Sequence, residues 1–141
     1  MKDLYNNLEI VSVLDPIVVS ATATHPDIDL ADFNSACLVV NCGLAAGTTL
    51  GSSHKFVFVL YDKAESTDDY AVVETADMLD LTVASGVVIT IDAVGEDNSI
   101  YKLGYVGGKR YLQLVYTKTG SPTIPLSIEV IKSHGLDVPA I

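Results

Sequence analysis

The sequence predicts an all-β protein, a single-domain antiparallel β-sandwich that is jelly-roll-like, with about eight to nine strands and little or no helix. Short runs rich in β-branched and aromatic residues recur along the chain, and clusters of Gly, Asp, Asn, Ser and Pro separate them. Hydrophobic residues make up 49% of the 141 residues and charged residues 18%, which is a globular composition. The chain has no internal repeat or distinct linker, so residues 1–141 are expected to form one domain.

The turn signals divide the chain into candidate strands. The first two are residues 8–14 and 17–21, separated by Asp15-Pro16, because the residue before a proline avoids helical geometry and marks a turn or strand end. Residues 1–7 come before the first strand and are a possible extended N-terminal arm. The other candidate strands are residues 35–42, 54–61, 70–73, 86–91, 100–105, 109–118 and 123–131.

Alternation along the strands predicts which of them are central. Both faces of the strand at residues 54–61 are apolar, as expected of a strand covered on two sides. The strand at residues 109–118 has one apolar face, formed by Leu112, Leu114 and Tyr116, and a second face of mixed character. We therefore expect the first strand to be central and the second to leave one face available to a neighbour.

Two connections have a local signature. The pair Gly107-Gly108 lies between the strands at residues 100–105 and 109–118, and Gly-Gly favours the positive φ angles of a tight hairpin turn. This stretch is therefore predicted to be a β-hairpin. Residues 73–81 carry the chain's one hint of helical periodicity, and their short length predicts a single turn or loop that crosses between strands.

The charge of the chain argues against several classes of partner. The net charge is −10, which disfavours nucleic acid and anionic membranes because both are bound mainly through Lys and Arg. No apolar run approaches the roughly 18 residues that span a bilayer. The first ten residues, MKDLYNNLEI, carry acids and amides where a signal peptide is apolar, which predicts synthesis and retention in the cytoplasm.

Cysteine and histidine do not form a recognisable metal or redox motif. Cys37 and Cys42 lie in one predicted strand on opposite faces, roughly 16 Å apart, so no disulfide is expected between them. His25, His54 and His134 lack the spacing of zinc-binding motifs. We therefore expect no metal and no cofactor.

Two acidic segments are weak candidates for a cation site. Asp62, Glu65, Asp68 and Asp69 could supply oxygens to Ca²⁺, but the ligand order and the glycine of the EF-hand loop are absent. A solvated loop between strands is the favoured interpretation. The acids of residues 25–33, HPDIDLADF, are interpreted in the same way, as turn-capping and solubilising residues.

No motif predicts catalysis. The GxSxG elbow of hydrolases is absent, and GYVGGKR lacks the spacing and the Ser or Thr of a phosphate-binding loop. A pair of carboxylates for glycoside hydrolysis stays open, because the separation of such a pair is a three-dimensional quantity. The sequence predicts that the chain is not an enzyme.

Three segments carry a family resemblance: DLYNNLEIVSVLDP, IDLADFNSACLVVNCG and YKLGYVGGKRYLQLVYTKTG. In this order they resemble small virion proteins of tailed bacteriophages, namely head decoration or cement proteins. HKFVFVLYDKAESTDD and SHGLDVPAI extend the resemblance over most of the chain, and GYVGGKRY is its most specific part. The two cysteines and residues 44–53 have no counterpart in the pattern.

The resemblance implies a structural role rather than catalysis. It implies a β-sandwich, made in the host cytoplasm, that forms homotrimers and binds the capsid exterior of the virion. Its partner there would be the major capsid protein, whose adjacent subunits it would clamp after the shell expands. Neither a cofactor, nor nucleic acid, nor a membrane is implied.

Two groups of residues are the candidate contacts with the capsid. One is a basic, tyrosine-rich patch in the predicted hairpin, although these tyrosines would serve equally well to cover the rim of the core. The other is the N-terminal arm, whose apolar side chains could add to a neighbour's sheet. The patch comprises Tyr101, Tyr105, Lys109, Arg110 and Tyr111, and the arm residues are Leu4, Tyr5 and Leu8.

Two alternatives remain open. The same sandwich suits a tail, head-completion or fibre-base component of a phage, and sequence does not separate these positions. A carbohydrate-binding or adhesion module is the other alternative, which the absence of Trp weakens because Trp gives the largest stacking surface for sugars.

Overall fold

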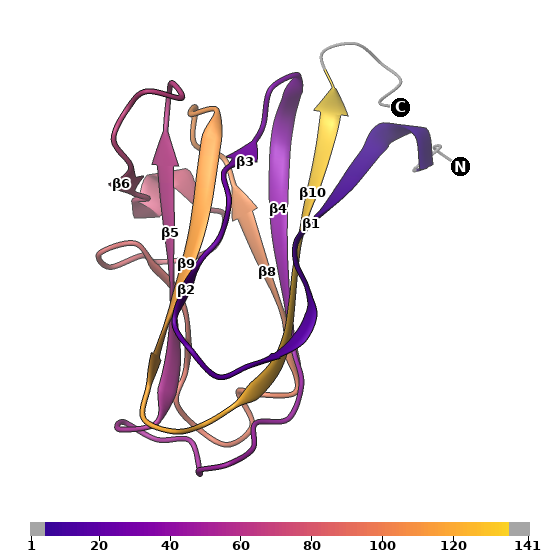
Figure 1. Cartoon of the computed structure of the whole chain (residues 1–141). Helices are drawn as coiled ribbons and strands as arrows, with labels where there is room; N and C mark the ends of the chain where they lie inside the picture. The colour runs from indigo at the N-terminus through magenta and orange to yellow at the C-terminus, as the bar shows by residue number, and fades with distance from the viewer. Residues whose placement is uncertain (1–4, 136–141) are drawn as a thin grey trace.

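The computed structural model describes residues 5–135 and places their strands in two antiparallel sheets that face each other across a common core (Figure 1). The prediction of an all-β sandwich is confirmed. The helical segments of the described chain are two 3₁₀ turns, η1 (Tyr5–Asn7) and η2 (Thr75–Asp77). The strands are β1 (Leu8–Val19), β2 (Ala23–Thr24), β3 (Ile28–Asp29), β4 (Phe33–Cys42), β5 (Lys55–Lys63), β6 (Ala71–Val72), β7 (Val87–Ile91), β8 (Ser99–Tyr105), β9 (Tyr111–Thr119) and β10 (Ile124–Gly135).

The strand order is that of a jelly roll. One sheet has the order β1-β10-β4-β8, and the other is built on the pair β9 and β5. β2 and β3 both pair with β9, and β6 and β7 both pair with β5, so each couple acts as one interrupted strand. If β2 and β3 are counted together as strand 2, and β6 and β7 together as strand 5, the chain has eight strands numbered along the sequence. These eight strands lie in the order 1-8-3-6 in one sheet and 2-7-4-5 in the other, which is the jelly-roll arrangement.

Side-chain alternation fills the space between the sheets. In β5, Phe56, Phe58 and Leu60 are fully buried, while the intervening residues lie on the outer face of the sheet. β5 pairs with β9 on one side and with β6 and β7 on the other, which confirms that it is central. Cys37 and Cys42 are free thiols on opposite faces of β4, as expected.

The predicted hairpin around Gly107-Gly108 is wrong. β8 pairs with β4 in one sheet and β9 pairs with β5 in the other, so residues 106–110 cross from one sheet to the other instead of joining neighbouring strands. Neither glycine has a left-handed backbone conformation. Gly107 is required for a different reason, because a Cβ at this position would overlap the ring of Tyr105.

Other local predictions differ from the structure in their bounds. The two strands predicted before residue 22 form one strand, β1, whose register shifts around Leu14 accommodate Pro16. β2 and β3 were not predicted, because two-residue strands carry no periodicity. Residues 5–7 form the η1 turn rather than an extended arm, and residues 1–4 lie outside the described residues. The single turn expected within residues 73–81 is confirmed as η2.

Candidate functional site

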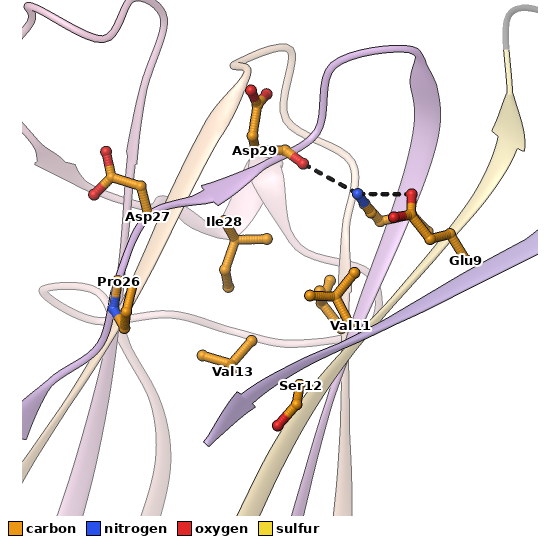
Figure 2. A pocket seen from close by; sticks show the side chains of 10 residues that line it. Glu9, Val11, Ser12, Val13, Pro26, Asp27, Ile28 and Asp29 are labelled. Carbon is orange, nitrogen blue, oxygen red and sulfur yellow. Dashed lines mark hydrogen bonds and ion pairs between the residues drawn. The ribbon is translucent and has the colours of Figure 1, made fainter. Parts of the chain in front are cut away.

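A cleft lies at one edge of the sandwich, between β1 and the β2–β3 segment (Figure 2). Its volume is about 310 Å³. β1 is the edge strand of its sheet, and the facing edge of the second sheet consists of the two-residue strands β2 and β3. The short strands leave this side of the sandwich incompletely closed.

The walls of the cleft are apolar. Val11 and Val13 of β1 lie opposite Ile28 of β3 (Figure 2). Val130 of β10 also contributes to the lining. Val11 pairs with Val130, which is 1% exposed, whereas Val11 itself remains 38% exposed. The interior face of β1 therefore keeps an apolar side chain that the described residues cover only in part.

The buried ammonium of Lys132 lies at the charged end of the cleft. Its Nζ lies 2.9 Å from Glu9 Oε2, donates to the backbone carbonyl of Asp29 at 3.4 Å and sits 4.8 Å from the centre of the Phe33 ring. Lys132 points inward from β10, so burial of its charge requires these partners. The contacts tie β1 and β3 together at this end of the cleft.

Asp27 and Asp29 continue the charged end on the opposite wall. Asp27 Oδ2 lies 3.2 Å from Lys63 Nζ. The Tyr70 hydroxyl lies beside Asp27 without regular hydrogen-bond geometry, and together with Lys63 it lowers the pKa of that carboxyl. Asp29 accepts two hydrogen bonds from the Arg110 guanidinium, at 2.8 and 2.7 Å, which also lowers its pKa. Both carboxylates are therefore charged at neutral pH.

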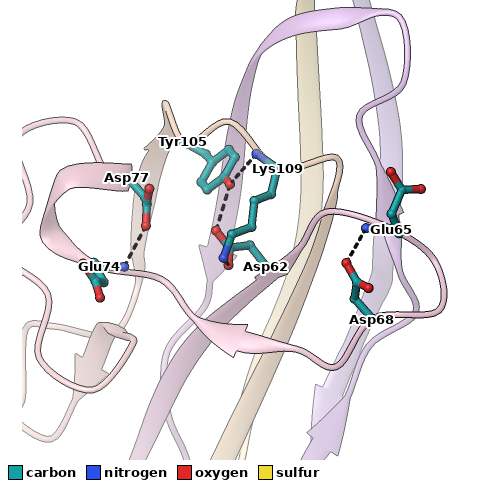
Figure 3. A network of polar contacts seen from close by, with 7 residues as sticks. All are labelled: Asp62, Glu65, Asp68, Glu74, Asp77, Tyr105 and Lys109. Carbon is teal, nitrogen blue, oxygen red and sulfur yellow. Dashed lines mark hydrogen bonds and ion pairs between the residues drawn. The ribbon is translucent and has the colours of Figure 1, made fainter.

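The structure divides the predicted hairpin patch into separate environments. Tyr105 is 3% exposed, and its hydroxyl donates a 2.9 Å hydrogen bond to Asp62 Oδ2 (Figure 3). Lys109 Nζ binds the other oxygen of Asp62 at 2.8 Å, which raises the pKa of Lys109. These two patch residues hold the 106–110 crossover against β5, and Tyr105 has little surface left for a partner.

Arg110 and Tyr111 form a second part of the patch, beside Asp29. The guanidinium of Arg110 lies 4.9 Å from the centre of the Tyr111 ring, and Lys63 Nζ lies 5.6 Å from the same ring. Both residues are on the outer side of the β9 sheet, close to Asp29. Tyr101 is separate from them, because it lies toward the opposite end of β8, where its hydroxyl donates to the Glu96 carbonyl.

The residues predicted for the N-terminal arm also have different environments. Tyr5, in η1, is 90% exposed. Leu8 is not in a free arm, because it pairs with Ser133 at the start of β1. Leu4 lies outside the described residues.

The acidic loop does not gather its carboxylates around a common point. Asp62 points toward Tyr105 and Lys109, while Asp68 accepts a hydrogen bond from the backbone of Glu65 within the loop (Figure 3). Within residues 5–135, no group of three or more His, Cys, Asp or Glu side chains is placed to hold a metal ion. No helix in this part of the chain is long and apolar enough to span a bilayer.

Sequence reasoning missed the cleft. Asp27 and Asp29 were interpreted as loop residues, and nothing linked them to Glu9 or Lys132, which are more than a hundred residues apart in the chain. One available signal was the Lys at position 132, which interrupts the inward-facing apolar positions of the last strand.

The described residues therefore define a jelly-roll β-sandwich with a cleft at one edge. No protein-family model and no curated protein sequence matches the chain. Among solved structures, the chain is similar to the SPBc2 prophage-derived protein YomS, with a TM-score of 0.50 over 91% of this chain and 94% of that chain. The sequence identity is 9%, so the similarity establishes a shared fold.

Proposed function

We propose that the chain is a structural protein of a tailed-bacteriophage virion, and that it serves as a decoration or cement protein on the capsid exterior. Three observations support this role. The sequence segments described above resemble phage decoration proteins, the jelly roll is a recurrent fold of viral structural proteins, and a prophage-derived protein shares the fold. The jelly-roll fold and the fold shared with a prophage-derived protein do not distinguish a decoration protein from other proteins of this fold. The proposal therefore depends most on a surface suited to assembly.

Such a surface lies on the outer face of the four-stranded sheet. The outward positions Ile10, Ile131, Cys37 and Gly104 follow one another across β1, β10, β4 and β8. Leu79 covers Gly104, since a Cβ there would lie 3.0 Å from Leu79 Cδ1. A row of apolar side chains on an outer sheet face is typical of an interaction surface. This outer row is the observation that carries the proposal.

Binding would stabilise the capsid by linkage. A protein that binds only the assembled, expanded lattice stabilises it by RT ln(1 + [L]/Kd), about 2.7 kcal/mol per site at a hundredfold excess over Kd. Each contact needs an interface of about 1,000 Å² or more to be stable. Homotrimers would meet this requirement by sharing several contacts, and the molar mass from light scattering tests that association.

Binding to empty expanded heads of the same phage tests the role directly. Leu79→Glu and Ile100→Glu place charges on the outer face of the four-stranded sheet, where both residues are exposed. We expect both variants to lose at least about tenfold in affinity, because a buried unpaired carboxylate is costly. Thr90→Glu is the matched control, because Thr90 is exposed on the other sheet.

The same assay tests the basic patch. If Arg110 and Tyr111 anchor the protein, Arg110→Ala and Tyr111→Ala weaken capsid binding while both variants remain folded. Unchanged binding of these two variants would exclude the patch, and unchanged binding of Leu79→Glu and Ile100→Glu would exclude the outer face of the four-stranded sheet that carries the outer row. A wild-type protein that does not bind the heads would contradict the decoration role itself.

Copy number separates decoration from the other virion positions. A decoration protein is present in a simple ratio to the major capsid protein, whereas a tail, head-completion or fibre-base component is present in few copies. Quantitative mass spectrometry of purified virions measures this ratio. A glycan-binding module would need an exposed aromatic platform, and within residues 5–135 every tyrosine except Tyr5 is at least partly buried.

A further inference from the structure

Among residues 5–135, the edge strand β1 has a strand partner on one side and none on the other. It hydrogen-bonds to β10 on the paired side, and the register shifts that follow Ser12 bend its second half. Bulges and prolines are common ways to protect an edge strand, and here they protect only residues 14–17. The first half of β1, residues 8–12, keeps a regular register and a free edge.

The cleft beside this edge has room for side chains. At about 310 Å³ it lies near the lower limit of ligand pockets, which occupy roughly 300 to 1,000 Å³. Val11, in the wall formed by β1, is partly uncovered. A strand added next to residues 8–12 would direct every second side chain into the cleft, against Val11 and Ile28.

The carboxylates at one end of the cleft indicate the charge of the strand that would bind there. Glu9, Asp27 and Asp29 stand at one end of the cleft, and their side chains are 41%, 45% and 44% exposed. Two of their present partners, Lys63 and Lys132, are nearly buried, whereas Arg110, the partner of Asp29, is exposed on the outer side of the β9 sheet. A second copy of this chain would bring further negative charge to a molecule of net charge −10. A basic segment is complementary to this end of the cleft.

We propose that the cleft between β1 and β3 binds an extended segment of a partner protein that pairs with the free edge of β1. An apolar side chain of the segment fills the cleft against Val11, and a Lys or Arg two residues further along reaches Asp27 and Asp29. The recognised pattern is an apolar residue followed at the second position by a basic one. The inference does not depend on the proposed capsid role.

Titration of the ¹⁵N-labelled full chain with short peptides tests the proposal. The probe is the octapeptide TVTKTVTK with blocked ends, and its control is TVTETVTE. We expect saturable amide shifts at residues 9–13 and 27–29, with a Kd of about 1 mM or tighter for the lysine peptide. The glutamate peptide should bind at least about tenfold more weakly than the lysine peptide. Added salt should weaken the binding of the lysine peptide.

Two variants with matched controls locate the site. Asp27→Asn should lower the affinity for the lysine peptide about three- to tenfold. Asp32→Asn changes an exposed carboxylate outside the cleft and should leave that affinity unchanged. Val11→Lys should abolish binding, and Ile100→Lys on the opposite edge strand should preserve it. The amide spectra of the free variants report whether each is folded.

Three results would overturn the proposal. The first is no saturable shift at these residues in the folded wild-type protein, and the second is equal binding of the two peptides. The third is a dimer of the free chain, measured by light scattering, that Val11→Lys converts to a monomer, because a second copy would then occupy the edge. Because the assay contains no capsid, its outcome is separate from that of the decoration role.

Discussion

At the scale of single residues, His25 combines burial with a missing hydrogen bond. The side chain is 6% exposed, its ring centre lies 5.4 Å from that of Tyr116, and Nε2 has no hydrogen-bond partner among the described residues. Burial lowers the pKa of His25 from its ordinary value of 6.5. The folded protein therefore keeps this imidazole neutral at a pH where the unfolded chain would bind a proton.

We predict that this histidine makes the protein less stable in mild acid. Because the pKa is lower in the folded state, its contribution is complete above pH 6.5 and is lost as the pH falls through the folded pKa. The free energy of unfolding should decrease by at most about 1.4 kcal/mol per pH unit from this group. Urea denaturation between about pH 7.5 and pH 5 measures it.

Two histidine variants separate this effect from other titrations. His25→Gln should flatten the decrease in stability between about pH 7.5 and pH 5, and His134→Gln, at an exposed position, should leave it unchanged. A pH dependence that persists in His25→Gln would assign the acid sensitivity to other groups. The depressed pKa values of Asp27 and Asp29 act at lower pH, below about 4.

At the scale of elements, the 106–110 crossover shows how a local signal can mislead. Its composition is that of a tight turn, yet its ends belong to different sheets. The crossover is positioned by side chains, since Tyr105 and Lys109 both bind the buried Asp62. Gly107 lies where the Tyr105 ring must pass, which explains the glycine without a positive φ angle.

This difference gives a prediction for the two adjacent glycines. Gly107→Ala should lower the free energy of unfolding by about 1–3 kcal/mol, because the new methyl group displaces Tyr105 from Asp62. Gly108→Ala should change it by less than about 0.5 kcal/mol, because no atom lies within 4 Å of the added Cβ. Chemical denaturation of both variants measures the difference. Equal, large losses would instead support a tight hairpin turn with positive φ angles at both positions.

The sequence predicted the strands better than their partners. Apolar residues on both faces identified β5 as central, because alternation is a property of one strand. Jelly-roll pairing joins distant segments, and no local pattern states that β8 pairs with β4 rather than with β9. The cleft was not predicted for the same reason, because Glu9 and Lys132 meet only when the first and last strands pair.

At the scale of the whole molecule, the pairing of β1 with β10 predicts a sharp limit to N-terminal deletion. A chain that starts at Leu8 keeps the whole of β1 and loses η1, including the hydrogen bond from the Ser133 hydroxyl to the Asn7 carbonyl, so it should fold with a loss of about 1 kcal/mol. A chain that starts at Val13 lacks the regular half of β1, which leaves that part of β10 without its partner strand, so this chain should not fold. Circular dichroism melting curves distinguish these outcomes.

The same deletion tests the N-terminal arm. If residues 1–7 contribute to capsid attachment, the chain that starts at Leu8 should occupy fewer sites on expanded heads while remaining folded. Undiminished occupancy would exclude the arm. Cooperative melting of the chain that starts at Val13 would show that β1 is dispensable for the sandwich.

The position of β10 has a consequence for synthesis on the ribosome. β10 is the last described strand to be translated, yet it lies between β1 and β4 in its sheet. Until it emerges, β1 has no partner, and the edge and cleft beside it do not exist. A nascent or prematurely terminated chain therefore cannot present the proposed recognition surface, so any binding at this edge must wait until β10 has been translated.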